Sequence, residues 1–224
     1  MKINSILTMS ALMLANSAHA NWPTLDNTKV YLTAEIGQQK TTMKSGGFNT
    51  AGNFENTNND KESGKEIEVK VGAAYMNNWR FDIGYRKYDR QEYTTDSFKL
   101  SAPTFLYTSK IETKAVMATV YYDFLKLEKL SFYGGAGVGK STTKISTNDG
   151  VVQGSGKESN TAWQVELGAD YRLTESLTFD TGFRYVDLGE TKIKTQLIAV
   201  DFQTGDFTAD LSSKEVFLGL RYTF

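Results

Sequence analysis

The fold is decided by residues 66–86, which read EIEVKVGAAYMNNWRFDIGYR. On each side of the pair Asn77-Asn78, apolar residues occupy every second position, and charged or small residues occupy the positions between them. A period of two is typical of a β-strand with two unlike faces, and adjacent asparagines suit a tight turn. The stretch therefore predicts a β-hairpin that has one apolar face and one charged face.

The same alternation recurs along the rest of the chain. It predicts eight strands, near residues 30–37, 66–75, 79–86, 111–122, 132–139, 163–172, 177–185 and 216–224. The fourth strand has apolar residues at both parities, so the sequence leaves its two faces unassigned.

The links between these strands alternate in length. Short links alternate with long polar ones at residues 41–64, 89–109, 141–160 and 187–213, which is the pattern of short periplasmic turns and long outer loops. Within the last of these, residues 191–200 look like an extension of a hairpin above the membrane. The sequence therefore predicts an all-β fold, an eight-stranded antiparallel transmembrane β-barrel of up-and-down topology.

The first 20 residues have the features of a secretory signal. Lys2 precedes an apolar run from Ile3 to Leu14, and Ala18-His19-Ala20 fits an A-x-A cleavage site. The run is shorter than the roughly 20 residues that a membrane-spanning helix needs. We therefore predict a cleaved signal peptide at residues 1–20 and one barrel domain at residues 21–224.

The composition argues against several classes of function. The chain has 26 acidic and 25 basic residues, so it offers no basic field for nucleic acid. It contains no cysteine, and its single histidine, His19, lies in the predicted signal. We therefore expect no disulfide, no metal ion, no cofactor and no histidine-based catalysis.

An exported β-sandwich would also alternate, but two features favour the barrel. Aromatic residues lie at both ends of the predicted strands, as in interfacial girdles: Tyr75, Trp79, Tyr171, Phe179 and Phe224 on the turn side, and Tyr85, Trp163 and Tyr185 on the loop side. Charges gather on the face opposite the apolar one, where a sandwich core could hold them only at a high desolvation cost.

By parity, the interior face carries a nearly balanced set of charges. The seven acids and six bases are Glu35, Glu66, Glu68, Asp82, Glu166, Asp170 and Asp180, with Lys70, Arg80, Arg86, Arg172, Arg184 and Arg221. An eight-stranded barrel is just wide enough for its side chains to fill it. We interpret this network as a structural plug, with a gated ion path as the functional alternative.

One motif suggests a different chemistry. Gly134-x-x-x-x-Gly139-Lys140-Ser141 satisfies the phosphate-loop pattern, which needs a helix after it. Residues 142–150 are instead polar and β-branched, without a helical period. We interpret the glycines as part of a barrel strand and place Lys140 near the outer interface, and we expect no nucleotide to bind.

Several segments resemble the opacity-protein and OmpA-like outer-membrane β-barrel superfamily. They are the hairpin around residues 75–81, FYGGAGVG at 132–139, LGADYRLT at 167–174, GFRY at 182–185 and the ending LRYTF at 220–224. The resemblance implies an outer-membrane location, with outer-membrane lipid and lipopolysaccharide as surroundings. It also implies that Tyr222 and Phe224 belong to a signal read by the barrel-assembly machinery.

Members of that superfamily are commonly surface antigens and adhesins. The resemblance implies a non-enzymatic surface protein whose outer loops bind host or environmental partners. The alternative is a small OmpW-like channel or uptake porin for small or apolar solutes. Exposed aromatic residues can anchor a partner, and the candidates in the predicted loops are Phe48, Phe54, Tyr93, Phe98, Phe105 and Tyr107.

Overall fold

The computed structural model describes residues 28–50, 53–57, 60–75, 78–97, 105–148, 152–197 and 203–224. The predicted signal peptide lies outside these residues and stays a prediction. Among the described residues, no helix is long and apolar enough to cross a membrane. The strands are β1 (Thr28–Thr50), β2 (Asn53–Thr57), β3 (Asp60–Tyr75), β4 (Trp79–Tyr88), β5 (Gln91–Ser97), β6 (Phe105–Lys126), β7 (Leu130–Asn148), β8 (Val152–Arg172), β9 (Leu177–Leu197) and β10 (Gln203–Thr223).

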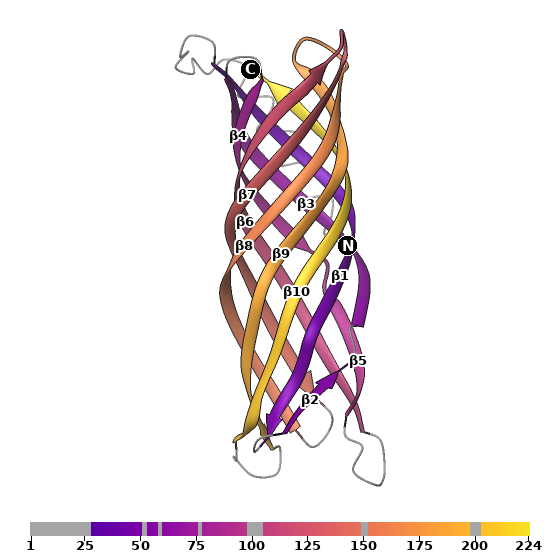
Figure 1. Cartoon of the computed structure of the whole chain (residues 1–224), viewed down its shortest axis with the longest axis vertical. Helices are drawn as coiled ribbons and strands as arrows, with labels where there is room; N and C mark the ends of the chain where they lie inside the picture. Colours follow the sequence, from indigo (N-terminus) through magenta and orange to yellow (C-terminus); the bar gives the residue numbers. More distant parts are fainter. Residues whose placement is uncertain are drawn as a thin grey trace, which may run out of the picture.

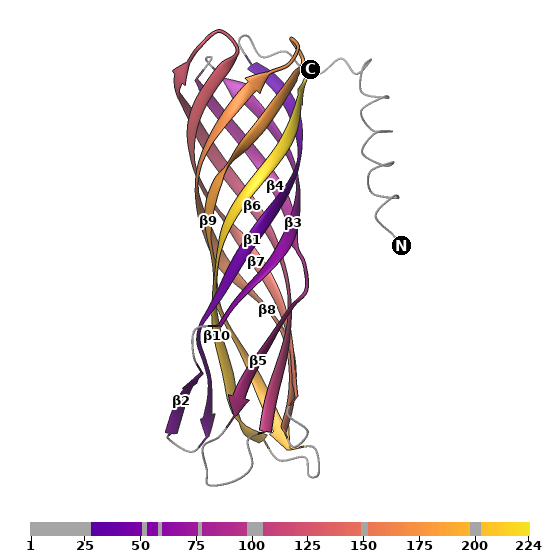
Figure 2. The same ribbon diagram turned by 90° about the vertical axis from the view of Figure 1, so that its right-hand side faces the viewer.

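Eight of these strands form a closed antiparallel ring (Figure 1). Its order is β1-β3-β4-β6-β7-β8-β9-β10, and β10 pairs with β1 to close it. The short strands β2 and β5 pair with β1 and β6, and both lie at the end of the barrel far from the C-terminus (Figure 2). The predicted eight-stranded, up-and-down antiparallel barrel is confirmed.

Most strands are far longer than a membrane requires. β1 and β6–β10 have 19 to 23 residues each, whereas about 9–11 tilted residues cross the hydrocarbon layer. The prediction of long polar loops is therefore wrong for most of their length: β7 continues to Asn148, and β8 begins at Val152. The extension expected at 191–200 is confirmed for residues 191–197.

We call the strand segments beyond the lipid-facing residues the outer extension, which comprises residues 38–50, 53–57, 60–65, 87–97, 105–114, 140–148, 152–161, 187–197 and 203–214. Buried apolar side chains form a core that fills its interior and continues a short way into the lipid-facing part of the barrel: Met43, Tyr88, Tyr93, Ile111, Ala115, Met117, Ile145, Ala162, Val186, Leu188, Ile193, Ala209 and Leu211. Because water replaces lipid around the extension, apolar side chains there point inward. The polar outer face is what made these segments look like loops.

Apolar residues thus face outward in the lipid-facing region and inward in the outer extension. This change also explains why β6, the fourth predicted strand, has apolar residues at both parities. Ile111, Ala115 and Met117 point into the barrel and are buried, whereas Val116 and Ala118 point outward. β6 crosses from the apolar core of the extension into the lipid-facing region. It therefore carries apolar residues first on one face and then on the other.

Candidate functional site

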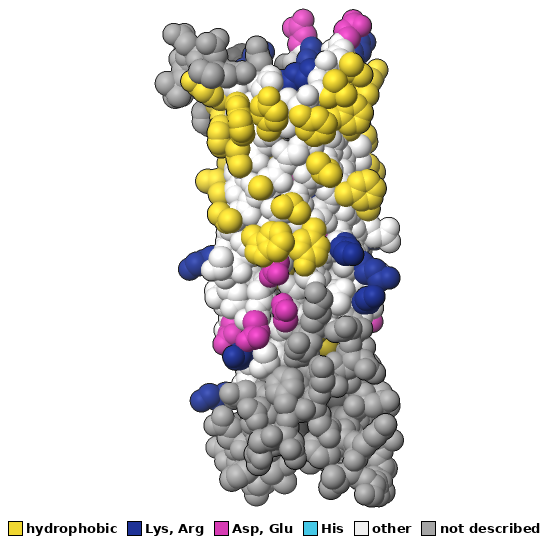
Figure 3. Space-filling model, viewed as in Figure 1, with side chains coloured by type: hydrophobic (Ala, Val, Ile, Leu, Met, Phe, Trp, Pro, Cys, Tyr) yellow, Lys and Arg dark blue, Asp and Glu magenta, His cyan; other side chains and the backbone are white. Residues whose placement is uncertain are grey.

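The outer surface carries an apolar band, part of which Figure 3 shows in yellow. Ile36 is 64% exposed and Phe183 is 70% exposed, which suits side chains in contact with lipid. Aromatic pairs mark both edges of the band. Trp79 lies 4.8 Å from Tyr122 between ring centroids near the turns, and Trp163 lies 5.4 Å from Tyr185 on the loop side. These pairs agree with the two predicted girdles.

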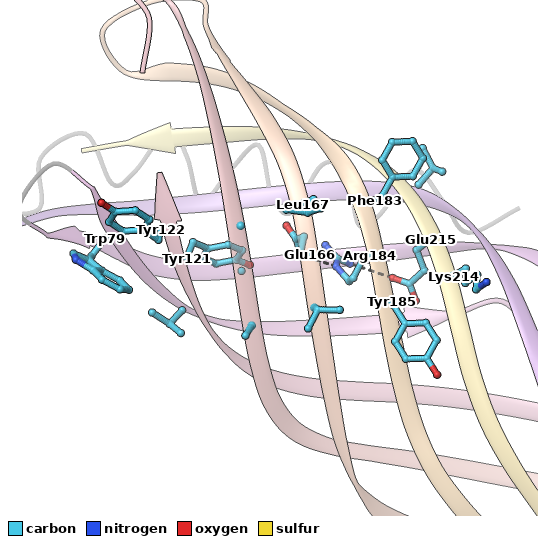
Figure 4. A pocket seen from close by; sticks show the side chains of 16 residues that line it. Trp79, Tyr121, Tyr122, Glu166, Leu167, Phe183, Arg184, Tyr185, Lys214 and Glu215 are labelled. Carbon is cyan, nitrogen blue, oxygen red and sulfur yellow. Dashed lines mark hydrogen bonds and ion pairs between the residues drawn. The ribbon is translucent and has the colours of Figure 1, made fainter. Parts of the chain in front are cut away.

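A groove of about 780 Å³ crosses this band (Figure 4). Trp79 and Tyr122 lie at one end of it, and Tyr185 and Lys214 lie toward the other. The apolar side chains of β8–β10 and the small residues of β7 line the groove between them: Gly134, Ala136, Val165, Leu167, Phe183 and Val216.

Inside the ring, three bases share five glutamates, and we call this group the central cluster: Lys70, Arg86, Arg184, Glu35, Glu66, Glu68, Glu166 and Glu215. Arg184 is within ion-pair distance of all five glutamates. Its guanidinium nitrogens lie 2.7 Å from Glu35 and Glu166, 3.0 Å from Glu68, 3.2 Å from Glu215 and 3.6 Å from Glu66. Every side chain in the cluster is at least nine-tenths buried.

The other two bases complete the central cluster. Arg86 contacts Glu68 at 2.8 Å and Glu66 at 3.2 Å. Lys70 lies 2.5 Å from Glu35, and its ammonium group also donates to the Tyr121 hydroxyl at 3.2 Å. Pairing and hydrogen bonding of this kind are what buried charges require. The sequence-predicted network is therefore assembled from strands far apart in the chain.

A second group, the turn-side cluster, lies nearer the periplasmic turns and comprises Arg80, Arg221, Asp123, Asp170 and Asp180. Arg80 lies 3.0 Å from Asp123 and 3.3 Å from Asp170. Arg221 contacts Asp170 and lies 3.7 Å from Asp180. Asp170 and Asp180 are directly opposite each other in the β8–β9 ladder, so the two arginines offset the repulsion between them.

Tyr133 joins the two clusters. The Tyr133 hydroxyl donates to Asp180 at 2.7 Å and lies 3.1 Å from Glu166, and its ring centroid is 4.4 Å from the Arg80 guanidinium carbon. Gly168, on the neighbouring strand, leaves space for the Tyr133 ring, which a Cβ there would overlap. This role of Tyr133 was not predicted from the sequence, although the residue has inward parity on a glycine-rich strand.

The charged interior differs from the prediction in three residues. Arg172 has interior parity but is exposed, because it lies at the end of β8, where the barrel meets water. Glu215 and Asp123 are buried, but the sequence prediction placed them outside the strands. The buried set in the described part of the chain is therefore nine acids and five bases. Within it, five carboxylate oxygens accept no hydrogen bond from the described residues: Glu35 Oε1, both oxygens of Glu66, Asp170 Oδ1 and Glu215 Oε1.

The predicted loop contacts need one correction. Tyr93 is only 1% exposed and donates its hydroxyl hydrogen to Gln91 at 2.9 Å, because β5 turns it into the core of the outer extension. It is therefore not a surface anchor. The side chains of the other five candidates lie outside the described residues: Phe48, Phe54, Phe98, Phe105 and Tyr107.

The phosphate-loop pattern falls within a strand. Residues 134–141 form part of β7 and pair with β6 and β8 without interruption. Lys140 is exposed and lies opposite Val116 and Thr161. The segment therefore lacks the helix that would complete a phosphate loop, and its interpretation as a barrel strand is confirmed.

A closed strand ring with an apolar outer band, aromatic edges and a polar interior defines a transmembrane β-barrel. The chain belongs to the outer membrane protein beta-barrel domain family, whose model matches residues 5–224. Its location is the outer membrane.

The individual relatives share less than a third of their aligned residues with this chain. Outer membrane protein PagN of Salmonella typhimurium is 28% identical over 52% of this chain and 52% of its own. RC1281 of Rickettsia conorii, named as a candidate adhesin, is 23% identical over 59% of this chain and 57% of its own. The chain thus spans about half the length of these curated relatives. Neisserial surface protein A shares the fold, with a TM-score of 0.55 and 18% identity over 89% of this chain and 100% of that one.

Proposed function

We propose that the protein is a non-enzymatic adhesin of the outer membrane, whose outer extension presents strand tips to host or environmental partners. The observation that carries this proposal is the outer extension itself. β9 continues twelve residues past Tyr185, the outermost aromatic residue of its lipid-facing row, which is roughly 25 Å above the membrane for a tilted strand. The outer extension has its own apolar core, so its strands form a folded stalk that reaches this height.

The side chains that fill the barrel interior support a role as a closed scaffold and not as a pore. Arg86 and Arg184 in the central cluster are at most 2% exposed, and the apolar core fills the barrel beyond them. The strands therefore act as a scaffold, and specificity belongs to the tips. The name given to the Rickettsia relative agrees with an adhesive role.

A second candidate function is a narrow cation path. The buried excess of acids over bases favours it, because a ring of carboxylates attracts cations. It would require the central cluster to open, since its side chains fill the interior in the present arrangement.

Exchange of the tips tests the adhesin proposal. Replacing residues 98–104 and 198–202 with Gly-Ser segments of equal length is expected to reduce binding of expressing bacteria to host cells at least severalfold. The control is Ser155→Ala, an exposed change on the extension, which is expected to leave binding intact. Both proteins should keep the heat-dependent migration of a folded barrel. Full binding by the tip variant would contradict the proposal.

Conductance in planar bilayers separates the two candidates. The reconstituted protein is expected to show little stable conductance, and Glu68→Gln is expected not to create any. Defined current steps in the wild type, altered in size or cation selectivity by Glu68→Gln, would instead support the cation path.

We also propose that Phe224 takes part in assembly. Its amide donates to the Val30 carbonyl at 3.0 Å, and its ring packs 5.1 Å from that of Tyr222, so it belongs to the closing strand pair. Deleting Phe224 is expected to lower the folded surface level severalfold, whereas Phe224→Tyr should retain it. Equal surface levels of the deletion and the wild type, measured by cold SDS migration, would exclude this role.

A further inference from the structure

We propose that the free edge of β5 in the outer extension binds an extended peptide segment of a partner protein by strand addition. The site comprises the backbone of residues 91–97 and lies on the side of the extension, not at its strand tips. This inference rests on the adhesive function proposed above, and it names the form in which a partner would be held.

Beyond the membrane, the barrel wall divides into two sheets. One sheet has the order β5-β6-β7-β8, and the other joins β9, β10, β1 and the outer part of β3, with β2 paired to the end of β1. Apolar side chains of both sheets, such as Ile145 and Leu211, pack in the core between them. The sheets adjoin along two seams, one between β8 and β9 and the other between β3 and β5.

The seam between β8 and β9 is closed by side chains. The ladder between these strands is interrupted over residues 155–162 and 188–194, and it resumes farther out. Two hydrogen bonds from or to side chains cross the interruption: the Lys192 amide donates to the Glu158 carboxylate at 2.8 Å, and the Asn160 side-chain amide donates to the Thr191 hydroxyl at 3.0 Å. This seam therefore already has partners within the chain.

The seam between β3 and β5, which we call the open seam, is different. At its base, the Asp89 amide donates to the Lys65 carbonyl at 2.9 Å. Farther out, among the described strands, residues 60–64 pair with β1 alone and residues 91–97 pair with β6 alone; Figure 2 shows β2 and β5 as separate arrows. An unpaired strand edge presents a row of amide and carbonyl groups, which is a template for another strand.

Two buried amide groups near the base of the open seam have donors without acceptors. Gln39 is directly opposite Gly64, an edge residue of β3, and Gln91 begins β5; both are more than nine-tenths buried. Their side-chain oxygens accept hydrogen bonds from Thr41 and Tyr93, each at 2.9 Å. Neither side-chain nitrogen has a partner among the described residues. A buried donor without an acceptor costs free energy, and the carbonyl groups of an added strand would supply acceptors.

The neighbours of the open seam determine the pattern of the peptide. Tyr93 and Ile111 point inward from β5 and β6 into the apolar core, whereas Glu92 points outward and is exposed. A strand added beside β5 would continue this arrangement, because successive side chains point to opposite faces. The geometry therefore fits an extended segment of alternating apolar and polar residues, and not a helix.

The test uses the purified barrel and a short fluorescent peptide of alternating valine and threonine residues. The wild type is expected to bind this peptide, and to bind its fully N-methylated form at least about tenfold more weakly, because methylation removes the backbone donors. Lys61→Cys/Glu92→Cys places two exposed thiols on the two edges of the open seam. Bridging them with a bismaleimide is expected to abolish binding, whereas the unbridged variant should bind as the wild type does. The chain has no cysteine of its own.

The matched control is Lys144→Cys/Lys157→Cys, bridged in the same way across the intact β7–β8 ladder, where the two residues are directly opposite each other. It should bind the peptide as the wild type does, and cold SDS migration verifies that each variant is folded. Absence of binding by the wild type, equal binding of both peptide forms, or binding by the bridged seam variant would overturn the proposal. If exchange of the tips reduced adhesion while the bridged seam left it intact, the adhesin function would stand and strand addition at β5 would be excluded.

Discussion

Replacing Arg184 with alanine is expected to lower the free energy of unfolding by about 3–5 kcal/mol, because it leaves buried carboxylates without their main partner. Five glutamates lie within ion-pair distance of Arg184, and only Arg86 and Lys70 would remain in the central cluster to compensate them. The measurement is a urea titration in detergent micelles, followed by tryptophan fluorescence.

Arg90→Ala provides the matched control. Arg90 also pairs with a glutamate, Glu112, but both side chains are largely exposed, so its loss should cost less than about 1 kcal/mol. Arg184→Lys retains the charge but loses the planar fork that contacts several carboxylates at once, and an intermediate loss is expected. A loss at Arg184 as small as that at Arg90 would contradict the structural role of the central cluster.

Gly139→Ala is expected to destabilise the barrel by about 1–3 kcal/mol, the usual range for overpacking. A Cβ at Gly139 would overlap the carbonyl oxygen of Val116 and lie 2.8 Å from the Cα of Met117. Both are backbone atoms of β6, so the ladder itself would have to shift. The same urea titration measures the effect.

A second glycine of β7 controls for loss of backbone freedom. Gly134 faces outward, and a Cβ there would lie 3.5 Å from Leu167, an ordinary contact. Gly134→Ala is therefore expected to be neutral or mildly stabilising. If both variants lost the same stability, the cause would be strand propensity and not the close approach of β6 and β7.

The sequence predicted the strands best where lipid surrounds them. Around Ile67 and Phe81, apolar residues point to lipid and charges point to the interior, so parity identifies both faces. The strands of the outer extension were predicted as loops, because their apolar residues point inward and their outer face is polar. Ile145 and Ile193 are strand residues with inward parity, but their polar neighbours resemble those of a loop.

The interior network was predictable by parity, but its ends were not. Arg172 has the correct parity and yet reaches water, since its exposure depends on where the barrel ends. Glu215 was left out of the predicted network because the strand was predicted to start at Val216. β10 in fact begins at Gln203, so Glu215 lies within it and is buried. Which carboxylate each base contacts depends on the order of strands around the ring, which local alternation cannot provide.

The seam between β1 and β10 bears on how this protein folds. Tyr31 pairs with Thr223, almost 200 positions later in the chain, and this ladder continues along most of both strands. Contacts between residues so distant in sequence carry a large loop-closure entropy and slow folding. The ring cannot close until its last strand has been delivered, and until then both edges expose unpaired backbone groups. The pairing of β1 with β10 therefore requires both end strands to be present, and it is the step that removes the two free edges of the sheet.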